Sequence, residues 1–192
     1  MRTVWTIGHS NRSLEDFVAV LDAWGIAQVA DVRQFTRSRA NPQFNADSLA
    51  ARLGADRYVH LGALGGRRRV LGDDNLGWEH PAFRGYADYA ATAPFQVGLA
   101  ALEALAEARP TALMCAEILW WRCHRRILAD HLLVRGWEVW HVRDAAHRDR
   151  AVLTPFADVT GTEVRYPAPP GGAAQRTRPA ARPTAATRKG GS

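Results

Sequence analysis

Short runs of β-branched and apolar residues alternate along this chain with amphipathic segments of helical length, and this alternation restricts the fold more than any other feature. Five runs have the length and composition of strands, and they cover residues 3–7, 26–32, 57–61, 110–116 and 137–142. Helical segments lie between them at 13–24, 45–54, 82–92, 95–108 and 122–135. Strands that alternate with helices are typical of α/β proteins. We therefore expect a single domain with a mainly parallel sheet of about five strands flanked by helices.

A change in composition near residue 166 separates this domain from a C-terminal tail. Residues 167–192 consist mainly of Pro, Gly, Ala and Thr, with four Arg, one Lys and no acidic residue. They carry +5 of the formal charge of +6, so residues 1–166 are nearly neutral. Because the tail has too few apolar residues to form a core, we expect an α/β domain over 1–166 and a disordered basic tail over 167–192. The tail either contacts nucleic acid through its arginines or only solubilises the protein.

Composition also limits the compartment in which the protein works. The hydrophobic share is 47%, but no apolar run approaches the eighteen or so residues that span a membrane. The first residues, MRTVWTIGHSNRS, lack the apolar segment and cleavage site of a signal peptide. Two cysteines do not form a disulfide framework in a chain of 192 residues. We therefore expect a cytoplasmic protein without membrane contact, and its oligomeric state is unknown.

Polar residues follow four of the expected strands at the point where each strand ends. In chain order they are His9 and Ser10, then Asp31 and Arg33, then Arg67 and Arg68, and finally Cys115, Glu117, Trp121, Cys123, His124 and Arg125. Ligands of open parallel sheets bind outside the carboxyl ends of the strands. The sequence therefore predicts one pocket at this edge, and its arginines indicate an anionic ligand.

The stretch MCAEILWWRCHRR at 114–126 contains both cysteines of the chain. If the helix that follows begins near Arg122, then Cys123, His124 and Arg125 lie in its first turn. Free backbone N–H groups there stabilise an anion or a thiolate. Each residue also has a structural interpretation, because cysteine and tryptophan commonly pack in cores and a histidine or an arginine can bridge a helix to a sheet.

From these patterns we assign a role to each candidate residue. Acid–base or nucleophilic catalysis is assigned to Glu117, Asp31, His124 and Cys123, with Asp31 as the partner that orients Glu117. Substrate binding is assigned to His9, Ser10, Arg33, Arg67, Arg68, Trp121 and Arg125. Among these, Arg33 and Arg125 are expected to hold the anion, and Trp121 to stack on a ring.

Residue spacing excludes several familiar sites. Neither cysteine is followed by an arginine at the interval of a cysteine-phosphatase loop, and the seven residues between Cys115 and Cys123 are wrong for a structural zinc site. The glycines of GALGGRRR match neither a P-loop nor a dinucleotide fingerprint. We therefore assign no cofactor and no metal, with a metal held by Cys115, Cys123, His124 and His9 as an alternative.

Several motifs together resemble a known family. They are TIGHS at 6–10, DVRQFTRSRANPQF at 31–44, Tyr58 with LGGRR at 64–68, and the Cys-Ala-Glu and Cys-His-Arg motifs of 115–125. In this order they resemble the bacterial and archaeal family called domain of unknown function 488, from about residue 4 to residue 143. The family is known by its motifs more than by an established reaction, so the resemblance implies little about activity. Thr36 and Trp120 stand where proline is common in the family, which puts the shape of two loops beside the expected site in doubt.

Two classes of function fit these residues. The first is a hydrolase that acts on a phosphate-bearing nucleotide or nucleic acid, in which arginines hold the anion and Glu117 or Asp31 activates water. Cleavage of an N-glycosidic bond is a concrete version, because it needs a carboxylate, a stacked base and no cofactor. The second class is a non-catalytic module that binds nucleic acid or a protein partner. Thiol redox chemistry or sulfur transfer at Cys123 is a third alternative. The expected ligand is thus an anionic small molecule or nucleic acid.

Overall fold

The computed structural model describes residues 2–169, and a six-stranded sheet with the order β3-β2-β4-β1-β5-β6 forms the centre of this part of the chain. The parallel strands are β1 (Thr3–Gly8), β2 (Gln28–Asp31), β3 (Tyr58–His60), β4 (Thr111–Cys115) and β5 (Glu138–Val142). β6 (Arg148–Arg150) pairs antiparallel with β5. The expected α/β fold with a mainly parallel sheet is therefore confirmed, and β6 is an edge strand that the sequence pattern did not indicate.

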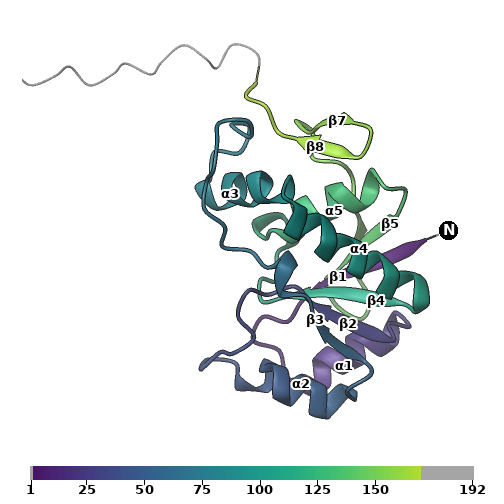
Figure 1. The fold of residues 1–192 in the computed structure, drawn as a ribbon. Helices are drawn as coiled ribbons and strands as arrows, with labels where there is room; N and C mark the ends of the chain where they lie inside the picture. Colours follow the sequence, from purple (N-terminus) through teal and green to yellow (C-terminus); the bar gives the residue numbers. More distant parts are fainter. Residues whose placement is uncertain (1, 170–192) are drawn as a thin grey trace, which may run out of the picture.

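Helices cover both faces of the sheet (Figure 1). One face carries α1 (Leu14–Ala23) and α2 (Ala46–Leu53), and the other carries α3 (Pro81–Ala90), α4 (Ala93–Ala108) and α5 (Arg125–Leu133). Short 3-10 turns are present at η1 (Pro42–Phe44), η2 (Gly62–Leu64) and η3 (Trp120–Arg122). A hairpin of β7 (Asp158–Thr160) and β8 (Glu163–Arg165) follows the sheet. None of the helices in residues 2–169 is long and apolar enough to cross a membrane.

Alternation along the strands divides the core into two layers. Ile7 and Met114 pack with Phe17 of α1 on one face, whereas Val4 and Leu113 belong to the cluster beneath α3, α4 and α5 on the other. Successive residues of a strand point to opposite faces, so a strand that is covered on both sides reads as a continuous apolar run. This explains why β2 and β4 are buried along their whole length.

Local signals set the ends of the first two helices. The hydroxyl of Ser13 accepts a hydrogen bond from the backbone N–H of Asp16 at 3.0 Å and caps α1. Gly25 and Gly54 follow α1 and α2 with φ values of 63° and 96°, which are unfavourable for other residues. Both helices therefore begin and end close to where the sequence predicts.

The chain belongs to the same core up to Tyr166. Tyr166 is fully buried, and its hydroxyl donates to a carboxylate oxygen of Asp130 in α5 at 2.8 Å. Its ring packs against Trp78, with 5.2 Å between the ring centroids. The packed part of the chain thus extends to residue 166. The tail expected over 167–192 lies, from residue 170 onward, outside the described residues.

Candidate functional site

The carboxyl ends of the central strands meet at one edge of the sheet. Gly8 pairs with Cys115, and Asp31 pairs with Met114 on one side and His60 on the other. Because β4 lies between β1 and β2, the segments that leave these three strands are neighbours. A pocket of about 930 Å³ opens there, at the edge where the sequence predicts it.

The loops after β1 and β4 touch at Gly8. A Cβ atom at this position would lie 2.1 Å from the carbonyl oxygen of Glu117, so only glycine fits. Beyond this contact the two segments stay paired, because the N–H groups of His9 and Ser10 donate to the carbonyls of Cys115 and Ala116, each at 2.9 Å. This pairing places His9 beside the residues that follow β4.

The structure brings seven of the eleven predicted site residues into the pocket wall. These are His9, Arg33, Arg67, Glu117, Trp121, Cys123 and His124. The remaining four, Ser10, Asp31, Arg68 and Arg125, do not line it. The wall also includes Gln34, Phe35, Arg37, Ser38, Asn41, Gly66, His80, Ala82, Phe83, Cys115, Ala116 and Arg122.

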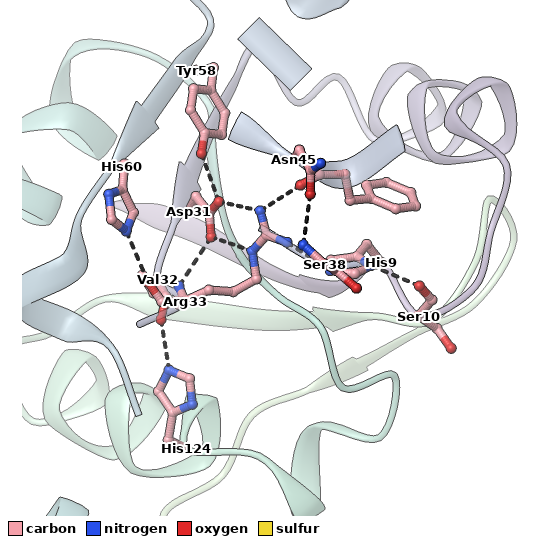
Figure 2. A network of polar contacts seen from close by, with 11 residues as sticks. His9, Ser10, Asp31, Val32, Arg33, Ser38, Asn45, Tyr58, His60 and His124 are labelled. Atoms are coloured by element: carbon pink, nitrogen blue, oxygen red, sulfur yellow. Dashed lines mark hydrogen bonds and ion pairs between the residues drawn. The ribbon is translucent and has the colours of Figure 1, made fainter. Parts of the chain in front are cut away.

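Asp31 and Arg33 form a buried ion pair, in which Arg33 lies in the pocket wall and Asp31 does not (Figure 2). Nε and Nη2 of Arg33 donate to the two carboxylate oxygens of Asp31 at 2.9 and 2.6 Å. The hydroxyl of Tyr58 donates to the same carboxylate at 2.7 Å, and burial together with the charge of Asp31 raises the pKa of this phenol. Asp31 is fully buried and Arg33 is 6% exposed, so this group is part of the framework that supports the pocket.

The expected pairing of Asp31 with Glu117 is therefore wrong. Both oxygens of Asp31 are already bound by Arg33 and Tyr58. Glu117 instead accepts a hydrogen bond from the backbone N–H of Leu119 at 3.0 Å, and its side chain lies in the pocket wall. Sequence could place both acids at the same edge, but the arginine two residues after Asp31 was the nearer partner.

His9 is held as a neutral ring. Its Nε2 accepts from Nη1 of Arg33 at 3.1 Å, and its Nδ1 donates to the carbonyl of Ser10 at 2.8 Å. Ser10 has a φ of 49°, which is unusual for a residue other than glycine. Burial, assisted by the nearby charge of Arg33, lowers the pKa of His9 to about 4. Both ring nitrogens are therefore engaged within the protein.

Cys115, Cys123 and His124 form a compact cluster in the pocket wall. Their sulfur and nitrogen atoms all lie within 4.8 Å of one another, and Nδ1 of His124 is 3.6 Å from Sγ of Cys123. Nε2 of His124 is 3.1 Å from the carbonyl oxygen of Val32 (Figure 2). Because a carbonyl oxygen only accepts hydrogen bonds, Nε2 carries the proton, and the lone pair of the neutral ring is on Nδ1, facing the sulfur.

The two thiols differ in their environment. Burial opposes ionisation of Cys123, but a hydrogen bond with Cys115 and the electrostatic influence of the neighbouring His124 and Arg125 outweigh it and lower the pKa of Cys123 well below its ordinary value. The same hydrogen bond, together with burial, raises the pKa of Cys115. Nε of Arg125 also donates to Sγ of Cys123 at 3.3 Å. Cys123 is therefore the thiol that ionises first.

The expected position of Cys123 within a first helical turn is wrong. α5 begins at Arg125 and is preceded by the 3-10 turn η3, and the N–H of Cys123 donates to the carbonyl of Trp120 at 3.1 Å. The thiolate is thus favoured by its side-chain neighbours and not by a helix terminus. Arg125 is 1% exposed and donates to Cys123 and to the carbonyl of Glu117, so it does not face a ligand in the pocket.

Exposed aromatic rings and arginines form the rim of the pocket. Phe35 is 63% and Trp121 is 43% exposed, whereas the neighbouring Trp120 stacks on His141 at 4.2 Å between ring centroids. Among the described residues that line the pocket, four are arginines and one, Glu117, is acidic. The guanidinium of Arg67 lies 5.7 Å from the ring centre of Phe35. The rim therefore offers flat apolar surfaces beside positive charge.

Sequence reasoning missed part of this wall. Phe35 and Arg122 had a usable signal, because each belongs to a segment that follows a strand. His80 and Phe83 had none, because they belong to the start of α3, which reaches the pocket only through the long connection after β3. Arg68 was placed wrongly: it donates to the carbonyl of Gly65 at 2.9 Å and lies 3.8 Å over the ring of Tyr89.

Comparison with known proteins gives one informative match. A family model described as domain of unknown function DUF488 matches residues 13–132. The matched segment contains Asp31, Arg33, Glu117, Cys123 and His124, and it ends within α5. No curated protein and no solved structure matches the chain significantly.

Proposed function

We propose that this chain, which belongs to the family of domain of unknown function DUF488, is a cytoplasmic hydrolase for an anionic substrate with a planar ring, such as a nucleotide or an unpaired base of a nucleic acid. One observation carries the proposal. A single pocket combines exposed aromatic rings, several arginines, one carboxylate and a cysteine–histidine cluster.

The rim of the pocket supports the choice of substrate class. A base stacked on an exposed aromatic side chain gains about 1–3 kcal/mol, and this gain hardly depends on the identity of the base. Trp121 and Phe35 offer such surfaces, and Arg67 and Arg122 are exposed beside them. Arginine binds phosphate through two parallel N–H donors. A phosphate-bearing nucleotide matches this combination better than a purely apolar ligand.

Glu117 supports the assignment to hydrolysis. It is the acidic residue that reaches the pocket, and it is partly exposed there. A carboxylate in such a position accepts a proton from water as the water attacks, and then returns the proton to the leaving group. Cleavage of an N-glycosidic bond remains the concrete version, with the leaving base held between aromatic rings.

Binding and turnover test the proposal separately. AMP, adenosine and inorganic phosphate serve as probes in calorimetric titrations, and we expect AMP to bind most tightly. Trp121→Ala and Arg122→Ala should each raise the dissociation constant of AMP by roughly 5–150-fold, the equivalent of about 1–3 kcal/mol. The matched controls Val97→Ala and Arg52→Ala alter exposed residues outside the pocket and should leave binding unchanged.

Glu117→Gln separates an enzyme from a binding module. Products of nucleotides and single-stranded oligonucleotides are separated by chromatography and identified by mass spectrometry. We expect the wild-type protein to release product, and the variant to bind AMP equally well but to lose turnover by about 100-fold or more. If the wild-type protein binds AMP without releasing product from any probe, the non-catalytic module replaces the hydrolase. If AMP does not bind, the substrate class is wrong.

Thiol chemistry at Cys123 is a second candidate, favoured by one observation. The sulfur of Cys123 lies 3.6 Å from the unprotonated nitrogen of His124 and close to Cys115, which is the geometry of a nucleophilic or redox-active thiol. This candidate requires a metal-free cluster, because a thiolate bound to a metal does not attack a substrate freely.

A further inference from the structure

We infer that Cys115, Cys123 and His124 bind a zinc ion whose fourth coordination position opens into the pocket. The three donor atoms lie within 4.8 Å of one another, and Cys123 Sγ and His124 Nδ1 are 3.6 Å apart. Zinc bonds to sulfur at about 2.3 Å and to nitrogen at about 2.0–2.1 Å, so two donors of a tetrahedral site lie roughly 3.5–3.8 Å apart. One ion can therefore bind all three donors after only small shifts of the side chains.

The surroundings of the cluster orient its donors as ligands. Nε2 of His124 donates to the carbonyl of Val32 at 3.1 Å, which fixes the ring and directs the lone pair of Nδ1 to the centre of the cluster. Hydrogen bonds of this kind from the second ring nitrogen accompany most zinc-binding histidines. Nε of Arg125 donates to Sγ of Cys123 at 3.3 Å, a contact that stabilises a metal-bound thiolate.

Gly66 leaves the required space beside the cluster. A Cβ atom at this position would lie 2.9 Å from Nδ1 of His124 and would crowd the nitrogen that faces the proposed ion. The space around His124, and not only the conformation of the loop, therefore explains why residue 66 of the LGGRR segment is a glycine. The backbone of this loop forms one side of the site while leaving the donor atom accessible.

The ligand count indicates a catalytic type of site. Structural zinc has four protein ligands, whereas catalytic zinc commonly has three and keeps one position for water or substrate. The chain has only two cysteines, and both nitrogens of His9 are already engaged. All three proposed ligands line the pocket, as does Glu117. An ion bound here is accessible to a substrate in the pocket.

Sequence spacing excluded a structural zinc site but left a metal held by these three residues and His9 as an alternative. Seven residues separate the two cysteines, an interval that does not occur in the short loops of structural zinc sites. In the folded chain, Cys115 ends β4, and the η3 turn brings Cys123 back beside it. The ligands are thus joined by the fold and not by a local loop.

The catalytic role of the ion rests on the proposed hydrolase function. Zinc lowers the pKa of a bound water to about 7, so that a hydroxide is available at neutral pH. Glu117 accepts the proton that the water loses. The hydroxide oxygen then bonds to the substrate atom under attack, the bond to the leaving group breaks, and Glu117 gives its proton to that group.

Metal analysis of the full-length protein tests the zinc site without any substrate. The protein is purified under reductant, stripped with a chelator and titrated with ZnCl₂ against a competing fluorescent chelator, and Co²⁺ is added separately for absorption spectroscopy. We expect one zinc per chain with a dissociation constant below micromolar, and a Co²⁺ spectrum with thiolate charge-transfer and tetrahedral bands. Cys115→Ser, Cys123→Ser and His124→Asn should each weaken zinc binding by at least about 100-fold, because even second-shell changes cost about 10–100-fold.

His80→Asn is the matched control, because it removes a pocket histidine outside the cluster and keeps a side chain that caps α3. It should bind zinc like the wild-type protein. Circular dichroism of each metal-free variant reports whether the fold persists. If a variant fails to fold, the Co²⁺ spectrum of the wild-type protein still tests the metal site.

A reduced wild-type protein that binds zinc more weakly than micromolar, or a Co²⁺ spectrum without thiolate bands, overturns the inference. Recovery of Cys115 and Cys123 as a disulfide that forms in the presence of excess zinc also overturns it and favours the redox candidate.

Failure of this inference can be told apart from failure of the proposed function. Zinc binding with no affinity for AMP leaves the metal site in place and removes the nucleotide hydrolase. AMP turnover by a protein that binds no zinc, and that is unaffected by a chelator, keeps the hydrolase and removes the metal.

Discussion

Arg33 lies in the pocket wall and also holds the framework of the site together. Its guanidinium contacts Asp31 and His9 and donates to the carbonyl of Phe44 at 2.7 Å. A buried arginine requires a counter-charge, because the ion pays a large desolvation penalty when it stands alone. The segment after β2 is therefore fixed to the sheet by the ion pair, and this segment carries Phe35 and Ser38 into the pocket wall.

Removal of the counter-charge of Arg33 should be strongly destabilising. We expect Asp31→Ala to lower the free energy of unfolding by about 3–5 kcal/mol, since the variant leaves the buried guanidinium unpaired. Urea unfolding followed by tryptophan fluorescence measures the change. Asp47→Ala is the control, because it breaks an ion pair with Arg37 in which both side chains are more than 80% exposed, and it should cost about 0–1 kcal/mol. The double variant Asp31→Ala/Arg33→Met should be more stable than Asp31→Ala; a less stable double variant would contradict this explanation.

Sequence predicted where the site residues lie but not what they contact. The rule that reactive residues follow parallel strands placed His9, Glu117, Cys123 and His124 at one edge correctly. It could not distinguish a residue that faces the pocket from one directly behind it, such as Asp31 or Arg125. That distinction depends on rotamers and on competition between neighbouring hydrogen-bond partners, and no periodicity in the chain records either.

At the scale of elements, the connection between η2 and α3 contains no helix or strand, and one carboxylate accepts three of its hydrogen bonds. Asp88 of α3 accepts hydrogen bonds from the N–H groups of Leu71 and Gly72 at 2.7 and 3.2 Å, and from the side chain of Asn75 at 2.8 Å. It is 9% exposed, so these bonds form largely away from water. The position of Arg67 and His80 in the pocket depends on this connection.

Asp88→Ala should loosen the connection and leave the sheet intact. We expect the free energy of unfolding to fall by about 2–4 kcal/mol, because three donors lose a shared, charged acceptor. Amide hydrogen exchange should accelerate in the peptide that covers residues 67–80 through local opening, whereas exchange in β1 and β4 should accelerate by no more than the fall in the free energy of unfolding allows. Asp74→Ala, which alters an exposed acid of the same connection, should change neither quantity. Equal exchange in this peptide for Asp88→Ala and the wild-type protein would show that the carboxylate does not hold it.

Most of the elements that were predicted from the sequence have a buried face. The parallel strands β1, β2, β4 and β5 and the helices bury apolar residues, and this produces the pattern in the sequence. β3 was predicted as well, although its three residues are only partly buried or exposed. β6 and β7 each have three residues that are exposed or partly exposed, so they leave no such pattern. The shift of the last helix from residue 122 to Arg125 has a related cause, because a 3-10 turn and a helical turn place polar residues in similar ways.

At the scale of the whole molecule, three buried histidines make the free energy of unfolding depend on pH. Burial is the largest influence on each, and it lowers the pKa of His9 and His131 to about 4 and that of His141 to about 3. All three therefore remain neutral in the folded protein near pH 7, whereas in the unfolded chain they titrate at about 6.5. They lie in different parts of the core, so acid weakens the whole domain and not only the pocket.

His131 offers the clearest test of this link, because neither of its ring nitrogens has a hydrogen-bond partner among the described residues. It is 2% exposed in α5, and its ring lies 5.0 Å from that of Phe95. Below pH 6.5 the unfolded chain binds a proton at this residue while the folded protein does not, so stability falls as the pH decreases. The loss ends near pH 4, where the folded protein is also protonated, and it amounts to roughly 3 kcal/mol for this one residue.

His131→Leu should therefore remove part of the acid sensitivity. We expect the free energy of unfolding, measured in urea at pH 7 and pH 4, to decrease less for this variant than for the wild-type protein, by roughly 3 kcal/mol. At pH 7 the variant should be at least as stable, because leucine buries a similar volume without two unpaired polar atoms. Val97→Leu changes an exposed residue of α4 that does not titrate and should keep the wild-type dependence on pH. An identical loss in His131→Leu and the wild-type protein would mean that His131 is hydrated in the folded state, and that the acid sensitivity arises at His9 and His141.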